Sequence, residues 1–102
     1  MEDITVHQLK EKMDHQADEI FVLDVREPYE YEEYNIGVTL IPLGQLPERI
    51  EELRPYAEKE ILIHCRSGKR SDTAKHFLLA NGFTKVSNVL GGMLAWEEAF
   101  GK

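Results

Sequence analysis

Short apolar runs alternate with helix-like segments along this chain. The runs at residues 20–25 and 61–64 are short, mostly apolar and rich in branched side chains, and a shorter run with a valine at each end lies at residues 86–89. Such runs are typical of buried strands. Between them lie segments in which apolar residues recur at helical spacing. This alternation predicts an α/β fold with a central, mostly parallel sheet flanked by helices on both faces.

Local signals also predict where helices begin and end. Thr5 is a good N-cap for a first helix of about two turns. Ser71 or Asp72 is expected to cap a helix in the second half of the chain. Asn81-Gly82 is expected to close that helix in a left-handed conformation.

Composition narrows the class of protein. The chain has 102 residues, of which 42% are hydrophobic and 30% charged, and we expect residues 1–102 to form one globular domain. A net charge of −7 argues against a nucleic-acid partner. We expect no membrane association, because no apolar run is long enough to span a bilayer and the acidic N-terminus lacks the apolar segment of a secretion signal. The single cysteine agrees with a reducing compartment, so the expected location is cytoplasmic.

Positive charge gathers around the only cysteine of this acidic chain. Four of the twelve basic residues lie within ten positions of one another, namely Arg66, Lys69, Arg70 and Lys75. Backbone N–H groups of a glycine-containing loop, together with those at the start of a helix, form an anion site. The same field favours thiolate over thiol. We therefore predict that Cys65 is a nucleophile in an anion-binding loop, with substrate-binding residues Arg66, Ser67, Gly68, Lys69, Arg70 and Ser71.

Three segments resemble the motifs of one family, in the family's order. Residues 63–71 resemble the active loop of single-domain rhodaneses, the sulfurtransferases that carry sulfur as a cysteine persulfide. Residues 23–28 resemble the family's early Asp-Val-Arg signature, and residues 90–96 its closing Gly-Gly…Trp motif. Asn35 stands where many members have histidine. The resemblance covers nearly the whole chain and implies a five-stranded parallel sheet.

The resemblance also implies a double displacement. The Cys65 thiolate would attack the outer sulfur of a small anionic donor such as thiosulfate, and a thiol or a protein would accept the sulfur from the resulting persulfide. The acceptor must be external, because the chain has no second cysteine. The histidines show no ligand spacing with one another or with Cys65, so we assign no metal, and the reaction implies no cofactor.

Other residues near the motifs are expected to support the site. Asp24 lies near the end of a predicted strand and Arg26 follows it, and we expect the two residues to hold the architecture around the loop together. His64 precedes the nucleophile, but neighbouring strand residues face opposite sides of a sheet. We therefore expect His64 to be packed or hydrogen-bonded rather than to act as a base.

One alternative is a cysteine phosphatase. That class uses the spacing Cys-x5-Arg, in which the arginine binds the phosphate with two parallel hydrogen bonds. Here Arg70 gives the spacing Cys-x4-Arg, and Ser71 stands where the phosphatase arginine would be. The shorter loop fits a sulfur atom better than a phosphoryl group, so the spacing argues against a phosphatase.

A second alternative is a relay or interaction module. Domains of this kind also pass sulfur between proteins in sulfur-carrier or thiolation pathways, or dock a partner. The intact cysteine and loop argue against a purely docking role. They do not separate a thiosulfate-using enzyme from a relay that receives its sulfur from a protein.

Overall fold

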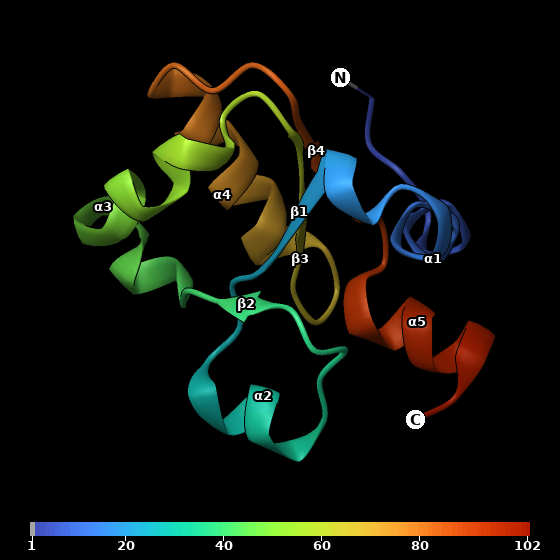
Figure 1. Cartoon of the computed structure of the whole chain (residues 1–102). Coiled ribbons are helices and arrows are strands. Elements are labelled where there is room, and N and C mark those ends of the chain that lie inside the picture. The colour runs from blue at the N-terminus through green and yellow to red at the C-terminus, as the bar shows by residue number, and fades with distance from the viewer. Residues whose placement is uncertain (1) are drawn as a thin grey trace.

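A parallel sheet lies at the centre of the computed structural model, which describes residues 2–102 (Figure 1). All pairings between its strands are parallel, in the order β2-β1-β3-β4. The strands are β1 (Ile20–Asp24), β2 (Thr39–Leu40), β3 (Glu60–His64) and β4 (Val86–Asn88). This confirms the predicted α/β architecture.

Helices cover both faces of the sheet. They are α1 (Val6–His15), α2 (Pro28–Glu33), α3 (Leu46–Arg49), α4 (Lys69–Ala80) and α5 (Gly92–Phe100), with short 3-10 helices at Ala17–Glu19, Leu43–Gln45 and Ile50–Tyr56. In Figure 1, α3 and α4 lie on one side of the sheet and α1 and α5 on the other. None of the helices in residues 2–102 combines the length and the apolarity needed to cross a bilayer.

Alternating side chains of the central strands build the two cores. Leu23 and Ile63 pack on the face covered by α4. Val22 and Leu62 pack on the face covered by α1 and α5. Because successive strand residues point to opposite faces, the short apolar runs in the sequence supply both cores at once.

The number of strands differs from the five that the family resemblance implies. Within residues 2–102 the sheet has four strands, and beside β4 there is only an isolated parallel bridge between Ile4 and Val89. The reason lies in the next residue. The Thr5 hydroxyl accepts a hydrogen bond from the N–H of Gln8 (3.1 Å), which starts α1 immediately and leaves no length for a strand.

The helix after the cysteine begins earlier than predicted. Gly68 is the N-cap of α4, with φ 103°, so the expectation that Ser71 or Asp72 caps this helix is wrong. Glycine adopts this left-handed conformation without steric cost, and α4 has no side-chain hydrogen bond from its N-cap. As a consequence, Ser71 lies inside the first turn of α4. The other end is as predicted, because Asn81 is the C-cap and Gly82 has φ 93°.

The strand order places a crevice at the carboxyl ends of the two central strands, β1 and β3. From β1 the chain goes to β2 on one side, whereas β3 leads to β4 on the other side. Loops that leave the carboxyl ends of β1 and β3 therefore diverge, and in open α/β sheets ligands bind at such a point. Asp24 ends β1 and His64 ends β3, so Cys65 follows directly at this crevice.

Candidate active site

The sulfur of Cys65 is surrounded by hydrogen-bond donors from its own loop. The residue is only 1% exposed. Its Sγ accepts from the N–H of Gly68 (3.1 Å) and the N–H of Ser71 (3.4 Å), and it lies 3.3 Å from the Ser71 hydroxyl. The loop that we name the cysteine loop, residues 65–70, together with the first turn of α4, thus closes around one sulfur atom.

Helix α5 turns the carbonyl groups of the cysteine loop away from the sulfur. The N–H of Met93 donates to the carbonyl of Cys65 (2.8 Å), and the N–H of Leu94 donates to the carbonyl of Arg66 (3.0 Å). The first N–H groups of a helix have no partner within the helix. Both sets of backbone groups are satisfied by this contact, and the N–H groups of the loop are left to face Sγ.

Only glycine fits where α5 meets the loop. Gly92 has φ 52°, and a Cβ at this position would lie 2.3 Å from the carbonyl oxygen of Cys65 and 2.7 Å from that of Arg66. Both are backbone atoms, so they cannot move aside as a flexible side chain would. Gly92 is therefore explained by the close approach of two backbones, whereas Gly91 has φ 79° and an added Cβ there would lie 2.6 Å from the Cβ of Ala95.

The donors around Sγ favour its charged form. Burial opposes the charge, but hydrogen bonds from the Ser71 hydroxyl and from the N–H groups of Ser71, Gly68 and Ser67 outweigh it and lower the pKa of Cys65. The predicted thiolate character of Cys65 thus has a specific origin, since the first turn of α4 and the loop backbone supply the donors.

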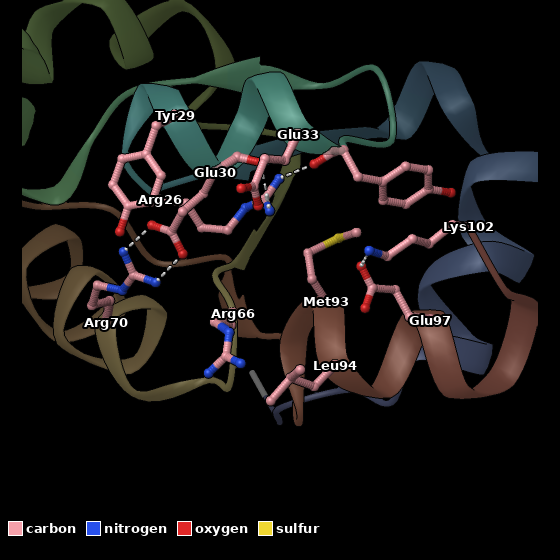
Figure 2. A pocket seen from close by; sticks show the side chains of 11 residues that line it. Arg26, Tyr29, Glu30, Glu33, Arg66, Arg70, Met93, Leu94, Glu97 and Lys102 are labelled. Atoms are coloured by element: carbon pink, nitrogen blue, oxygen red, sulfur yellow. Dashed lines mark hydrogen bonds and ion pairs between the residues drawn. The ribbon is translucent and has the colours of Figure 1, made fainter.

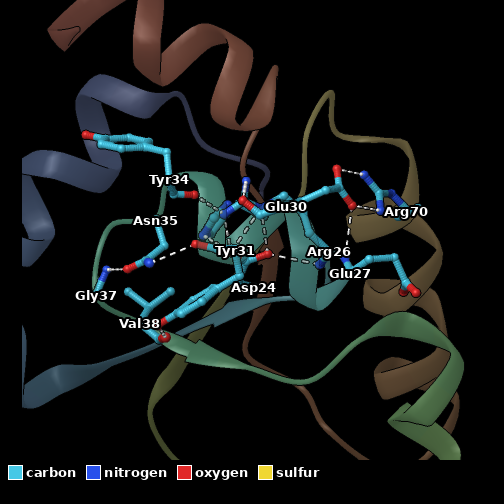
Figure 3. A network of polar contacts seen from close by, with 11 residues as sticks. Asp24, Arg26, Glu27, Glu30, Tyr31, Tyr34, Asn35, Gly37, Val38 and Arg70 are labelled. Atoms are coloured by element: carbon cyan, nitrogen blue, oxygen red, sulfur yellow. Dashed lines mark hydrogen bonds and ion pairs between the residues drawn. The ribbon is translucent and has the colours of Figure 1, made fainter. Parts of the chain in front are cut away.

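Arg70 binds an acid on α2. Its two terminal nitrogens contact the two carboxylate oxygens of Glu30 at 2.6 and 2.9 Å (Figures 2 and 3). The Arg70 guanidinium lowers the pKa of Glu30 to about 2, and the carboxylate raises the pKa of Arg70. This ion pair ties the start of α4 to α2 across the crevice.

A buried ion pair holds α2 in place. The Arg26 side chain donates to both carboxylate oxygens of Asp24 (2.8–3.1 Å) and to the carbonyls of Glu30 (3.3 Å) and Tyr34 (2.9 Å). Asp24 is 0% and Arg26 5% exposed, and Figure 3 shows the network between β1 and α2. Asp24 and Arg26 do pair, and they reach the cysteine loop indirectly, through α2 and Glu30.

A cavity of about 600 Å³ lies between α2, the cysteine loop and α5 (Figure 2). Its walls carry charges of both signs, aromatic rings and two apolar side chains of α5. They are formed by Arg26, Tyr29, Glu30, Glu33, Tyr34, Arg66, Arg70, Met93, Leu94, Glu97 and Lys102. Arg66 is the loop cation that lines this cavity without being engaged by Glu30.

The remaining loop residues lie at the surface. Ser67 and Lys69 are exposed, and neither lines the cavity. The structure therefore brings Cys65, Gly68 and Ser71 together at the sulfur. Of the three predicted cations, Arg66 and Arg70 line the cavity, where Arg70 is paired with Glu30, and Lys69 lies outside it.

His64 is packed in the interior of the protein. It is 1% exposed, and within residues 2–102 neither ring nitrogen has a hydrogen-bond partner. Its Nε2 lies 3.7 Å from a carboxylate oxygen of Asp24. Burial lowers the pKa of His64 and so favours the neutral ring, although the negative charge of Asp24 acts in the opposite direction.

Sequence reasoning missed residues that contact the site from other elements. Glu30 holds Arg70, and Asn88 contacts both the Ser71 hydroxyl and the carbonyl of Gly68. Glu30 is one of several acidic residues in α2, and nothing in the sequence distinguishes it from the others. Asn88 stands at the end of a predicted strand, beside the predicted ends of the other strands, and that position is a signal that could have found it.

The family follows from comparison with known proteins. A family model described as "Rhodanese-like domain" matches residues 5–99. The chain belongs to the rhodanese-like domain family. This agrees with the resemblance of the three motifs and with the parallel sheet flanked by helices.

Rhodanese-like relatives include sulfur-transfer proteins. The chain is 44% identical to the "Putative sulfur carrier protein YrkF" of Bacillus subtilis over 92% of its own length, but it spans only 50% of that protein. It is 40% identical to the "Putative sulfurtransferase YtwF" of the same organism, over 95% of this chain and 91% of that one. A crystal structure of a rhodanese-like domain protein from Staphylococcus aureus superposes with a TM-score of 0.83 at 32% identity, covering 94% of this chain and 91% of that chain.

The contact between Gly92 and the loop carbonyls predicts a large loss of stability in Gly92→Ala. Gly37 provides a matched control, because it also has a positive φ (79°) but an added Cβ would meet no atom within 4 Å. We expect Gly37→Ala to lower the free energy of unfolding by about 1 kcal/mol through backbone strain. Gly92→Ala should cost at least about 2 kcal/mol more, since backbone atoms must also shift. Urea denaturation measures both, and equal losses would contradict the argument.

The donors around Sγ predict an acidic thiol. The rate of alkylation by iodoacetamide should rise with pH through a midpoint below the ~8.5 of an ordinary cysteine, because the hydrogen bonds to Sγ favour the thiolate. The same chain in concentrated urea is the control, since unfolding removes these donors and should restore the ordinary midpoint. A folded midpoint equal to the unfolded one would show that the loop does not activate Cys65.

Proposed function

We propose that residues 1–102 form a single sulfurtransferase domain that carries sulfane sulfur as a persulfide on Cys65. Its donor is thiosulfate or another small anion, and its acceptor is a thiol or a protein. The observation that carries this proposal is the pair of backbone N–H groups, from Gly68 and Ser71, that donate to Sγ, with the Ser71 hydroxyl 3.3 Å from the same atom. The sulfurtransferase and sulfur-carrier names of the relatives support it.

The reaction proceeds in two displacements. The Cys65 thiolate attacks the outer sulfur of thiosulfate, the S–S bond of the donor breaks, and sulfite leaves with the bonding electrons. The persulfide now carries its negative charge on the outer sulfur, where loop N–H groups stabilise it. A nucleophilic acceptor, such as a thiolate or cyanide, then attacks that outer sulfur and regenerates the Cys65 thiolate. Cys65 is the only cysteine, so no second thiol of the chain takes up the sulfur.

The three loop cations have different tasks in this scheme. Arg66 lines the cavity, and we assign it the capture of the anionic donor. Arg70 is engaged by Glu30, so its task is to fix the start of α4, whose N–H groups face the sulfur. Lys69 contributes only to the surrounding field. Asp24 and Arg26 support the site by holding α2.

A relay module is the second candidate. It is favoured by the relative that is named as a sulfur carrier and that is about twice as long as the aligned segment. In that case a partner protein delivers or receives the sulfur at the same Cys65. The reduced single cysteine fits the cytoplasm, which we propose as the location for either function.

Incubation with thiosulfate is expected to add one sulfur atom to the intact mass of the protein, and dithiothreitol should remove it. Cys65 is the only thiol in the chain, so the adduct must lie there. Cys65→Ser should abolish both the adduct and thiocyanate formation from thiosulfate and cyanide, while circular dichroism shows an unchanged fold.

Two results would overturn the assignment. One is the absence of a sulfur adduct with every donor tested, including protein persulfides. The other is robust hydrolysis of p-nitrophenyl phosphate that is lost in Cys65→Ser, which would indicate a phosphatase. An adduct with protein persulfides but not with thiosulfate would instead favour the relay.

The separation of the cations predicts unequal effects on donor capture. Arg66→Ala should raise the thiosulfate KM roughly three- to tenfold, about 0.7–1.4 kcal/mol of lost attraction, with little change in kcat, the pattern of lost uniform binding. Lys69→Ala is the matched control and should have a smaller effect, because Lys69 does not line the cavity. Added salt should weaken thiosulfate use in the wild type and less in Arg66→Ala. A kcat collapse at constant KM would place Arg66 in the chemical step instead.

A further inference from the structure

Asn88, the last residue of β4, connects the two halves of the sulfur site. It is 4% exposed. Its Nδ2 donates to the carbonyl of Gly68 (3.0 Å), and its Oδ1 lies 2.5 Å from the hydroxyl oxygen of Ser71. The carbonyl can only accept, so it fixes which end of the amide faces it. The amide oxygen must therefore face Ser71.

The Ser71 hydroxyl has one proton, and two neighbouring atoms can accept it. The amide oxygen of Asn88 lies at 2.5 Å, and Sγ of Cys65 lies at 3.3 Å. When Cys65 is a thiol, one arrangement satisfies every group. The thiol proton points to the Ser71 oxygen, the Ser71 proton points to Asn88, and the amide of Asn88 donates to Gly68.

Loss of the thiol proton breaks this arrangement. If the Ser71 proton stays on Asn88, an oxygen lone pair faces the negatively charged sulfur. If the proton turns to the sulfur, the buried Oδ1 of Asn88 loses its donor, which has its own cost. Either way the thiolate is less stable than it would be with an unopposed Ser71 hydroxyl.

We propose that Asn88 is a positioning residue that sets, through the Ser71 hydroxyl, how readily the Cys65 thiolate forms. The effect of Asn88 on catalysis rests on the proposed sulfur transfer. In the persulfide, Sγ is bonded to sulfur and the charge lies on the outer atom, so the Ser71 proton returns to Asn88. Asn88 thus disfavours the empty thiolate relative to both the thiol and the loaded form, which makes the transfer of sulfur onto the thiolate more favourable.

Within residues 2–102, the charged groups around the site form no hydrogen bond with the Asn88 side chain. Arg70 of α4 is paired with Glu30 of α2, and Arg66 is exposed at the cavity, where Glu97 of α5 also lies. His64 of β3 lies beside Asp24. On the β4 side, Asp3 accepts from the backbone N–H of Asn88 (2.9 Å) and pairs with Lys75 (2.7 Å). This last contact anchors the backbone of Asn88 and leaves its amide side chain to Ser71 and Gly68.

The test is a cycle of four proteins, namely wild type, Asn88→Leu, Ser71→Ala and the double variant. The pH dependence of iodoacetamide alkylation gives the pKa of Cys65 in each. Leucine has a similar size but no acceptor, so in Asn88→Leu the Ser71 hydroxyl donates to Sγ without competition. We expect the pKa of Cys65 to fall by about one unit, the range of one hydrogen bond to a charge. In the Ser71→Ala background the same substitution should leave the pKa unchanged.

Other outcomes have definite meanings. An equal shift of the Cys65 pKa in the wild-type and Ser71→Ala backgrounds would show that Asn88 acts only through the Gly68 carbonyl. No shift in either background would show that Asn88 does not act on the thiol. Each of these results would overturn the proposal. Asn88→Ala, which should shift the pKa in the same direction, serves if Asn88→Leu does not fold by circular dichroism. Alkylation requires no sulfur donor, so this result is independent of whether a persulfide forms.

Discussion

Two hydrogen bonds from the start of α5 determine the shape of the active loop. They join the N–H groups of Met93 and Leu94 to the carbonyls of Cys65 and Arg66. Each bond satisfies a helix N–H and a loop carbonyl that otherwise lack partners within their own elements. With its carbonyls engaged on one side, the loop has its N–H groups free on the other, where the sulfur lies. The acidity of the thiol is thus a consequence of how two backbones pack, and Gly92 permits that packing.

A chain of ion pairs orients the opposite wall of the crevice. Asp24 binds Arg26, Arg26 binds carbonyls of α2, and Glu30 on α2 binds Arg70 at the start of α4. A buried ion pair adds little net stability, because desolvation offsets most of the attraction. The ion pairs instead fix the orientation of the groups they join, because each guanidinium group is planar and holds several acceptors at once. The thiol and the cavity keep their relative positions as a result.

Much of this site could be predicted because its determinants are local. The order of elements, the location of Cys65 after a buried strand and the pairing of Asp24 with Arg26 follow from short stretches of sequence or from the family resemblance. The contacts of Arg70 and Ser71 could not be predicted, because their partners Glu30 and Asn88 lie 40 and 17 positions away in sequence. The sequence pattern places the start of α4 too late for a related reason: Ser71 looks like a cap locally, whereas Gly68 takes that position and frees Ser71 to contact the sulfur.

The short outer strands have a consequence for association between copies. An exposed sheet edge offers unpaired N–H and C=O groups to another chain. Here the edge strand β2 has two residues and the edge strand β4 has three. Part of the β4 edge is further occupied by Ile4, which exchanges backbone hydrogen bonds with Asn88 (3.0 Å) and Leu90 (2.8 Å). Each edge therefore offers little free backbone to a strand of a second copy, so both edges of the sheet resist edge-to-edge aggregation.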